Sequence, residues 1–166
     1  MSARFAFVAA ATLAVLLALP RFAGAPGAVA TTATDVEDGI VHVRSAYTYA
    51  ETIERLQRDI AAKGIRMFAV VDQSGLAAAA GVPLAPSTLL IFGNPPLGAQ
   101  FITSRASAGL DWPVRLLVQQ DERGAVWARY TDFAWIARRH RIEDRKEAFE
   151  KAAGVIASIT SSVAAR

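Results

Sequence analysis

The side chains best suited to acid–base chemistry in this 166-residue sequence are Asp72, Asp132 and His140. A carboxylate and an imidazole can exchange protons with a substrate near neutral pH, as a hydrolase or a lyase requires. The residue after Asp72 is Gln73, whose amide forms hydrogen bonds but does not titrate. His140 falls at the predicted end of a helix, where a histidine commonly interacts with the helix dipole. An enzyme that uses Asp72, Asp132 and His140 is therefore the alternative function, without a local motif to support it.

The sequence excludes several kinds of chemical site. Gly93 and Gly98 have the spacing of a phosphate-binding loop, but Ala99 and Gln100 occupy the positions at which that loop needs Lys and Ser or Thr. No G-x-S-x-G serine elbow is present, and the two histidines are not at metal-ligand spacing. The chain contains no cysteine, which rules out disulfides and thiolate metal sites. We expect neither a metal nor a cofactor.

The strand that ends at Asn94 is the candidate for a non-catalytic binding site. Residues 87–98 read STLLIFGNPPLG: an apolar run, expected to be a central strand buried on both faces, stops at a glycine, an asparagine and two prolines. The Asn94 amide can bond the nearby backbone in a turn or face a ligand. The preceding strand ends at Asp72. If these two strands run parallel, as a helical crossover allows, Asp72, Gln73 and Asn94 lie at one rim of the sheet.

A later strand ends at Tyr130 and can bring two more polar residues to that rim if it runs the same way. The expected ligand-binding residues are therefore Asp72, Gln73, Asn94, Tyr130 and Asp132. A structural role is the competing interpretation, because Asp72 and Asp132 precede predicted helices and can cap them, while Asn94 can form a turn.

Hydrophobic periodicity predicts the elements that position these residues. Apolar or alternating runs predict five strands, and apolar residues at helical spacing predict the helices. Thr48 followed by Glu51 forms a capping box at the start of the first helix. The loop 121–124 suits a hairpin between the last two strands. The strands are expected at 40–44, 66–71, 89–92, 113–120 and 125–130, and the helices at 49–60, 76–80, 97–105, 132–140 and 143–163.

The first thirty residues have the pattern of a secretory signal peptide. Residues 1–30 contain Arg4, an apolar run over 5–19 and a final Ala-Val-Ala. The run is shorter than the about 20 residues that span a bilayer, so a retained N-terminal anchor is the alternative. Residues 31–39 are expected to form a flexible segment and residues 40–163 a single α+β domain. We therefore expect the protein to be periplasmic or secreted.

The order of the elements predicts an α+β fold, with a mixed five-stranded sheet and helices packed mainly on one face as a two-layer sandwich. The runs LLIFGNPPLG and VWARYTDFAWIARRH, in this order and spacing, resemble the family called domain of unknown function 302 (DUF302). The resemblance extends over about residues 40–161 and implies a small α+β fold without an established activity. Members commonly carry a histidine where this chain has Gln73, so any proton transfer by that histidine is lost here.

Charge and composition limit the partners. Removal of Arg4 and Arg21 with the signal peptide reduces the formal net charge from +3 to +1, so no positive field points to a nucleic acid. We expect an exported, non-catalytic module that binds a small ligand or a partner protein, with a homodimer left open and no stable membrane insertion after signal cleavage. The ligand is expected near Asn94, Trp127 and Tyr130. A hydrolase or lyase remains the alternative.

Overall fold

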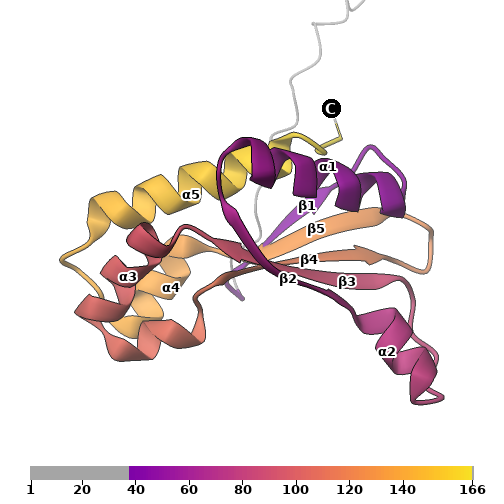
Figure 1. The fold of residues 1–166 in the computed structure, drawn as a ribbon, viewed down its shortest axis with the longest axis horizontal. Coiled ribbons are helices and arrows are strands. Elements are labelled where there is room, and N and C mark those ends of the chain that lie inside the picture. The colour runs from indigo at the N-terminus through magenta and orange to yellow at the C-terminus, as the bar shows by residue number, and fades with distance from the viewer. Residues whose placement is uncertain (1–37, 166) are drawn as a thin grey trace, which may run out of the picture. The chain divides into compact units, whose positions relative to one another are not determined.

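Five strands form one open sheet in the computed structural model, which describes residues 38–165 (Figure 1). The spatial order is β1-β5-β4-β3-β2, and every neighbouring pair is antiparallel. The predicted five strands and α+β class are confirmed. The strands are β1 (Ile40–Arg44), β2 (Arg66–Asp72), β3 (Ser87–Gly93), β4 (Val114–Gln120) and β5 (Val126–Thr131).

The prediction of a mixed sheet with parallel β2 and β3 is wrong. The two strands are antiparallel, and Asp72 at the end of β2 pairs with Thr88 near the start of β3. A parallel crossover needs a helix that runs back along the sheet. The connecting helix α2 (Gln73–Ala79) has seven residues, or about 10 Å of helix, which is too short to return along a strand of equal residue count. It projects from the end of the sheet instead (Figure 1).

Four of the remaining helices agree with the periodic pattern of the sequence, although the last begins at Lys146 rather than at 143, and the 3₁₀ helix over Ala106–Leu110 was not predicted. The predicted capping box at Thr48 and Glu51 is present, and Gly124 in the hairpin loop adopts a φ of 79°. Asn94 caps the helix that follows β3. This helix therefore begins at Pro95, in the proline pair, rather than at residue 97 as predicted. The helices are α1 (Tyr49–Ala62), α3 (Pro95–Ser104), the 3₁₀ helix η1 (Ala106–Leu110), α4 (Phe133–His140) and α5 (Lys146–Ser161).

The core lies between one face of the sheet and helices α1 and α5, while α3, η1 and α4 gather at one end (Figure 1). Leu90 of β3 and Leu116 of β4 are cross-strand partners in this core. The expectation that β3 is buried on both faces is wrong, because Leu89 and Ile91 are only half-buried on the opposite face. β3 is an interior strand, and β4 is the central one.

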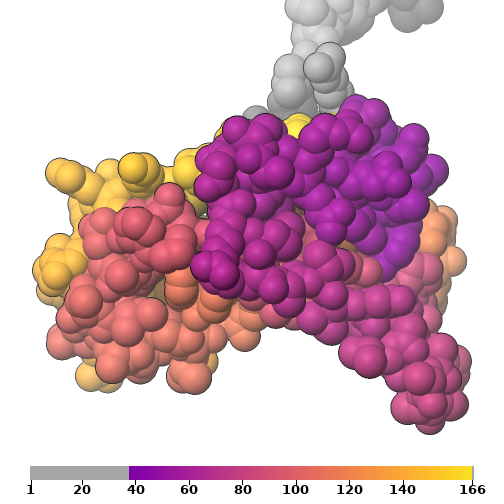
Figure 2. Space-filling view, in the orientation of Figure 1, coloured from indigo at the N-terminus to yellow at the C-terminus, as the bar shows by residue number. Residues whose placement is uncertain are grey.

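The β2–α2–β3 connection forms an arm that extends from the body of the domain (Figures 1 and 2). Helix α2 contains no buried residue, and its Leu76 is 64% exposed. Val82 and Leu84, which follow the helix, are also exposed. An apolar arm of this kind is unusual on the surface of a monomeric protein.

The expectations for residues 1–30, and for all but the last residues of the segment 31–39, lie outside the described residues. The signal peptide, the flexible segment and the domain boundaries stay predictions. None of the helices within residues 38–165 is both long enough and apolar enough to cross a membrane.

Candidate functional site

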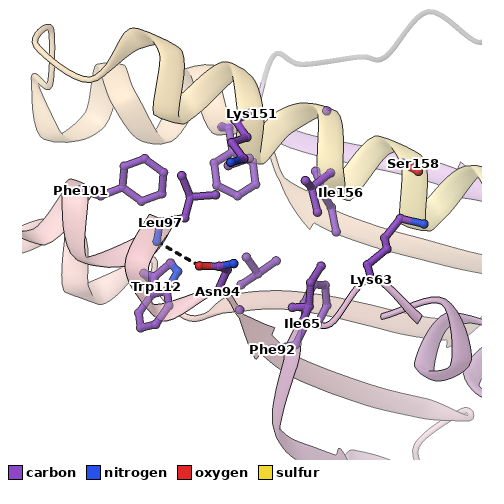
Figure 3. Close-up of a pocket in the computed structure, with 16 residues that line it drawn as sticks. Lys63, Ile65, Phe92, Asn94, Leu97, Phe101, Trp112, Lys151, Ile156 and Ser158 are labelled. Carbon is purple, nitrogen blue, oxygen red and sulfur yellow. Dashed lines mark hydrogen bonds between the residues drawn. The ribbon is translucent and has the colours of Figure 1, made fainter. Parts of the chain in front are cut away.

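A pocket of about 440 Å³ lies between α5, α3 and the end of the sheet where β3 stops and β4 begins (Figure 3). Helix α5 contributes one side through residues spaced three or four apart, which lie on one face of a helix. The opposite wall consists of strand and α3 residues. The apolar lining includes Ile65, Phe92, Leu97, Phe101, Trp112, Val114, Phe133, Val155 and Ile156.

Trp112 forms part of the pocket wall, and its ring occupies the space beside Gly93 and Gly98, the two glycines of the LLIFGNPPLG run. A Cβ atom added to Gly93 would lie 3.0 Å from the Trp112 ring, and one added to Gly98 would overlap with the ring. The absence of both side chains therefore makes room for the indole. These glycines are needed for packing, which agrees with the exclusion of a phosphate-binding loop.

We expect Gly98→Ala to lower the free energy of unfolding by about 1–3 kcal/mol, because the added methyl group must displace a packed indole. Chemical denaturation followed by circular dichroism measures the loss. The matched control is Gly154→Ala in α5. An added Cβ meets nothing within 4 Å there, and removal of a helix-interior glycine should stabilise by about 0.5–1 kcal/mol. Equal losses in the two variants would contradict the packing role of Gly98.

The polar side chains of the pocket mostly offer hydrogen-bond donors. Asn94 Oδ1 accepts from the Leu97 backbone N–H at 3.2 Å, which leaves the Asn94 NH₂ group to face other partners. Lys63 Nζ lies 2.7 Å from Asp59 Oδ2, whereas Lys151 forms no ion pair with a carboxylate of the described chain. In Figure 3, Lys151 extends from α5 on the side where Leu97 and Asn94 lie.

Three of the five predicted ligand-binding residues cap helices. Asp72 Oδ1 accepts from the Gly75 N–H at 2.9 Å, Asp132 Oδ1 accepts from the Trp135 N–H at 2.7 Å, and Asn94 caps α3. The hydrogen bonds from the Gly75 backbone and the Ser74 hydroxyl hold the pKa of Asp72 below its usual value. The capping interpretation therefore describes the contacts that these side chains make.

The antiparallel sheet divides the predicted site between its two ends. Asp72 and Gln73 lie at one end, where Gln73 Oε1 accepts from the Ser87 hydroxyl at 2.7 Å. Asn94 and Asp132 follow the ends of β3 and β5 at the other end, and Tyr130 is the second-last residue of β5. Of these, only Asn94 lines the pocket of Figure 3. Tyr130 packs against the core, and burial raises the pKa of its phenol.

The alternative enzyme residues are not brought together. Asp72 lies at the end of the sheet opposite Asp132. Asp132 precedes α4 and His140 ends it, so the rise of the helix separates them by about 12 Å. A site that combines these three side chains has no basis in this arrangement.

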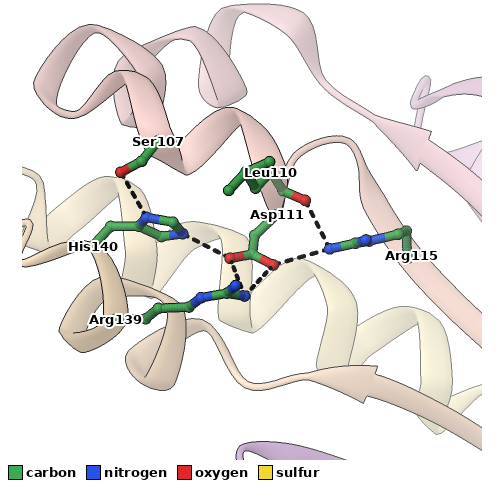
Figure 4. Close-up of polar contacts among 6 residues, drawn as sticks. All are labelled: Ser107, Leu110, Asp111, Arg115, Arg139 and His140. Carbon is green, nitrogen blue, oxygen red and sulfur yellow. Dashed lines mark hydrogen bonds and ion pairs between the residues drawn. The ribbon is translucent and has the colours of Figure 1, made fainter.

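His140 belongs instead to a polar cluster that links η1 to α4 (Figure 4). Its Nε2 atom lies 2.7 Å from Asp111 Oδ2, and its Nδ1 atom lies 2.9 Å from the Ser107 hydroxyl. Arg139 donates to both Asp111 oxygens at 3.1 and 2.9 Å, and Arg115 donates to Oδ1 at 2.9 Å. Three residues of β4 and α4 thus share the carboxylate of Asp111, which follows η1 directly, and Ser107 of η1 joins the cluster through His140.

The cluster has the residue types of a serine hydrolase triad but the surroundings of a structural clamp. The Asp111 and His140 side chains are only 3% and 4% exposed, and two arginines already neutralise the carboxylate. Ser107 does not line the pocket of Figure 3. Asp111 could not be identified from the sequence, because its separation of 29 residues from His140 leaves no local motif. Trp112 and Lys151 were missed for the same reason.

Comparison with a family model decides the relationship of the chain. The model described as Domain of unknown function DUF302 matches residues 41–159. The chain belongs to the DUF302 family. Its fold resembles the crystal structure of an uncharacterized conserved DUF302 protein from Bacillus stearothermophilus, with a TM-score of 0.69 and 18% identity over 75% of this chain and 98% of that one. At this identity the likeness establishes the fold alone.

Curated relatives include two proteins from Brucella that are larger than the matched DUF302 segment. Fluoride-specific ion channel FluC 1 of Brucella suis is 39% identical over 110 residues, which cover 66% of this chain and 43% of that protein. Fluoride-specific ion channel FluC 2 of Brucella melitensis is also 39% identical over 110 residues, which cover 41% of its length. The chain therefore spans less than half the length of these relatives.

Proposed function

We propose that this DUF302 protein is a non-catalytic domain that binds a small amphipathic anion in the pocket of Figure 3. The observation that carries the proposal is the chemistry of the lining, an apolar wall with mainly donor groups at its polar positions. Ligand pockets commonly have volumes of about 300–1,000 Å³ and a few placed polar groups in an apolar lining. The pocket of about 440 Å³ falls within that range.

The donors favour a ligand whose polar end accepts hydrogen bonds and carries negative charge. Lys151 supplies a cation without a carboxylate partner among the described residues, and the Asn94 NH₂ group supplies neutral donors. The apolar part of the ligand would contact Phe92, Trp112 and Ile156, which line the pocket. A carboxylate or a phosphate on an apolar chain or ring has both properties.

Two coarser expectations accompany this proposal. The pattern of residues 1–30 supports an exported protein that is periplasmic or secreted. We also propose that the protein partner of the chain can be a second copy of itself. Neither depends on the identity of the ligand.

The test is a calorimetric titration of the full chain with three probes of equal length: octanoate, octylamine and 1-octanol. We expect octanoate to bind most tightly, because its carboxylate can meet Lys151 and Asn94. Octylamine should bind most weakly, because its ammonium group would lie beside Lys151. Equal affinity for all three probes would show that the pocket binds only their apolar chain, which would contradict the preference for an anion. No binding of any probe would contradict the proposed function.

Matched variants connect the binding to the pocket. Gly154→Leu places a side chain at an open position of the lining and should abolish binding of octanoate, whereas Gly154→Ala should retain it. Lys151→Gln should weaken octanoate about fivefold, which corresponds to about 1 kcal/mol for a partly exposed ion pair, and leave 1-octanol unchanged. Lys146→Gln, at an exposed position on the same helix that does not line the pocket of Figure 3, is the control for net charge.

Two further readouts distinguish the competing functions. A titration with sodium fluoride, compared with one with sodium chloride, tests whether this chain binds fluoride, the ion in the names of the Brucella relatives. We expect no binding, because a small hard anion gains nothing from the apolar wall. The second readout is hydrolysis of p-nitrophenyl octanoate. If the chain hydrolyses this ester and both Ser107→Ala and His140→Ala abolish the activity, the protein is an enzyme and the proposal of a non-catalytic domain is wrong.

A further inference from the structure

A second hollow adjoins the pocket of Figure 3 at Lys151. This outer hollow has a volume of about 370 Å³ and shares Asn94, Leu97 and Lys151 with the pocket. Its remaining lining residues are Pro96, Gln100, Glu147 and Ala148. Because the same three side chains border both spaces, a ligand whose charged group reaches Lys151 has room to extend beyond it.

The outer hollow adds hydrogen-bond acceptors to the donors at its boundary with the pocket. Glu147 supplies a carboxylate that forms no ion pair with a base of the described chain. Gln100 Nε2 donates to the Pro96 carbonyl at 3.4 Å, which leaves Gln100 Oε1 to accept. At the boundary, Lys151 and the Asn94 NH₂ group can only donate. The order of chemistry is therefore apolar wall, donors, acceptors.

Glu147 and Lys151 of α5 carry opposite charges but do not pair with each other. Their spacing of four residues, with the glutamate first, is the one that favours an ion pair on a helix. No such pair forms among the described residues, although both side chains line the outer hollow. A ligand that carries an anion and a cation can satisfy both charges at once.

We propose that the ligand is a single-chain amphiphile with a zwitterionic head, in which the anion adjoins the chain and an ammonium group lies at the outer end. This inference rests on the proposed function, since it keeps the chain in the pocket of Figure 3 and the anion at Lys151. The ammonium group extends into the outer hollow and donates to Glu147 and Gln100. A single-chain ester of phosphoethanolamine has this order of groups.

Calorimetric titration of the full chain at pH 7 with three eight-carbon probes tests the order. In octyl 2-aminoethyl phosphate the ammonium group is outermost, in octyl propyl phosphate a methyl group replaces it, and in N-octylglycine the ammonium adjoins the chain and the carboxylate is outermost. We expect the first to bind about fivefold more tightly than the second, the gain from one partly exposed ion pair. N-octylglycine should bind most weakly, because its ammonium would lie beside Lys151 and its carboxylate beside Glu147.

Two glutamate variants connect this preference to the outer hollow. Glu147→Gln should abolish the preference for octyl 2-aminoethyl phosphate without weakening octyl propyl phosphate. The matched control is Glu150→Gln on the same helix, because Glu150 pairs with Lys146 at 3.8 Å and lines neither space. It should leave the preference intact. Equal effects of the two variants would overturn the contact with Glu147. Equal strengthening of both esters by Glu147→Gln would show that Glu147 pairs with Lys151 and would also overturn it.

The outcomes separate this inference from the proposed function. Binding of octanoate and octyl propyl phosphate without any gain from the ammonium group would overturn the zwitterionic head and keep the amphipathic anion. No binding of any probe would overturn both.

Co-sedimentation with phosphatidylcholine vesicles distinguishes a free amphiphile from a membrane surface. We expect phosphatidylethanolamine in these vesicles to add no binding, because the pocket of Figure 3 receives a single chain. Added binding would assign the ammonium group to a bilayer lipid and overturn the single-chain ligand.

Discussion

Replacement of Asp111 by alanine is expected to lower the free energy of unfolding by about 3–5 kcal/mol, the usual cost of removing one partner from a buried charged network. The carboxylate is 3% exposed and accepts hydrogen bonds from Arg115, Arg139 and His140 (Figure 4). Its removal leaves the buried His140 ring without its Nε2 partner and two arginines without their shared counter-charge. Urea denaturation monitored by circular dichroism measures the change.

The control for this variant is Asp144→Ala. Asp144 accepts a hydrogen bond from Ser104 and pairs with Arg145, but its side chain is largely exposed, so solvent replaces those contacts at little cost. The Ser104 hydroxyl donates to Asp144 Oδ1 at 2.6 Å and holds the pKa of Asp144 below its usual value, but this exposed contact contributes little to stability. Similar losses in Asp111→Ala and Asp144→Ala would mean that the cluster does not clamp η1 to α4.

Leu90→Ala is the second variant with a large expected effect, a loss of about 2–5 kcal/mol from a cavity in the core. Leu90 is fully buried against Leu116 of the central strand and the helices above it. The neighbouring Ile91 points to the opposite face of β3 and is half-buried. Ile91→Ala should therefore cost clearly less, although the two side chains have the same number of carbon atoms.

Thermal and urea unfolding of both alanine variants check this difference. A midpoint that falls equally in Leu90→Ala and Ile91→Ala would show that the open face of the sheet is as well covered as the helical face. A smaller loss at Leu90 than at Ile91 would contradict the assignment of the core to the face that α1 and α5 cover.

Local features of this protein could be predicted from the sequence because short segments determine them. The capping box needs only Thr48 and Glu51 within one helical turn, and both of its hydrogen bonds are present. The hairpin needs only a four-residue loop ending in Gly124, and β4 and β5 pair as expected. The strand and helix order, the α+β class and the DUF302 relationship follow from such segments.

The direction of β2 relative to β3 could not be predicted in this way. A helix between two strands is compatible with a parallel crossover or with an arm beyond the sheet, and the apolar pattern of each strand is the same in both cases. The short α2 helix extends outward, so Asp72 and Asn94 lie at opposite ends of the sheet. The predicted rim of Asp72, Gln73 and Asn94 depended on the other arrangement.

The sequence by itself thus determined the elements, their order and the family, because hydrophobic period, caps and turns act within a few residues. Only the tertiary structure decided where the pocket lies and what clamps η1 to α4. Trp112 meets Gly98, and Asp111 meets His140, through packing of segments that are distant in the chain. Side chains in such contacts carry no periodic signal of their own, since their positions are set by the joint packing of several elements.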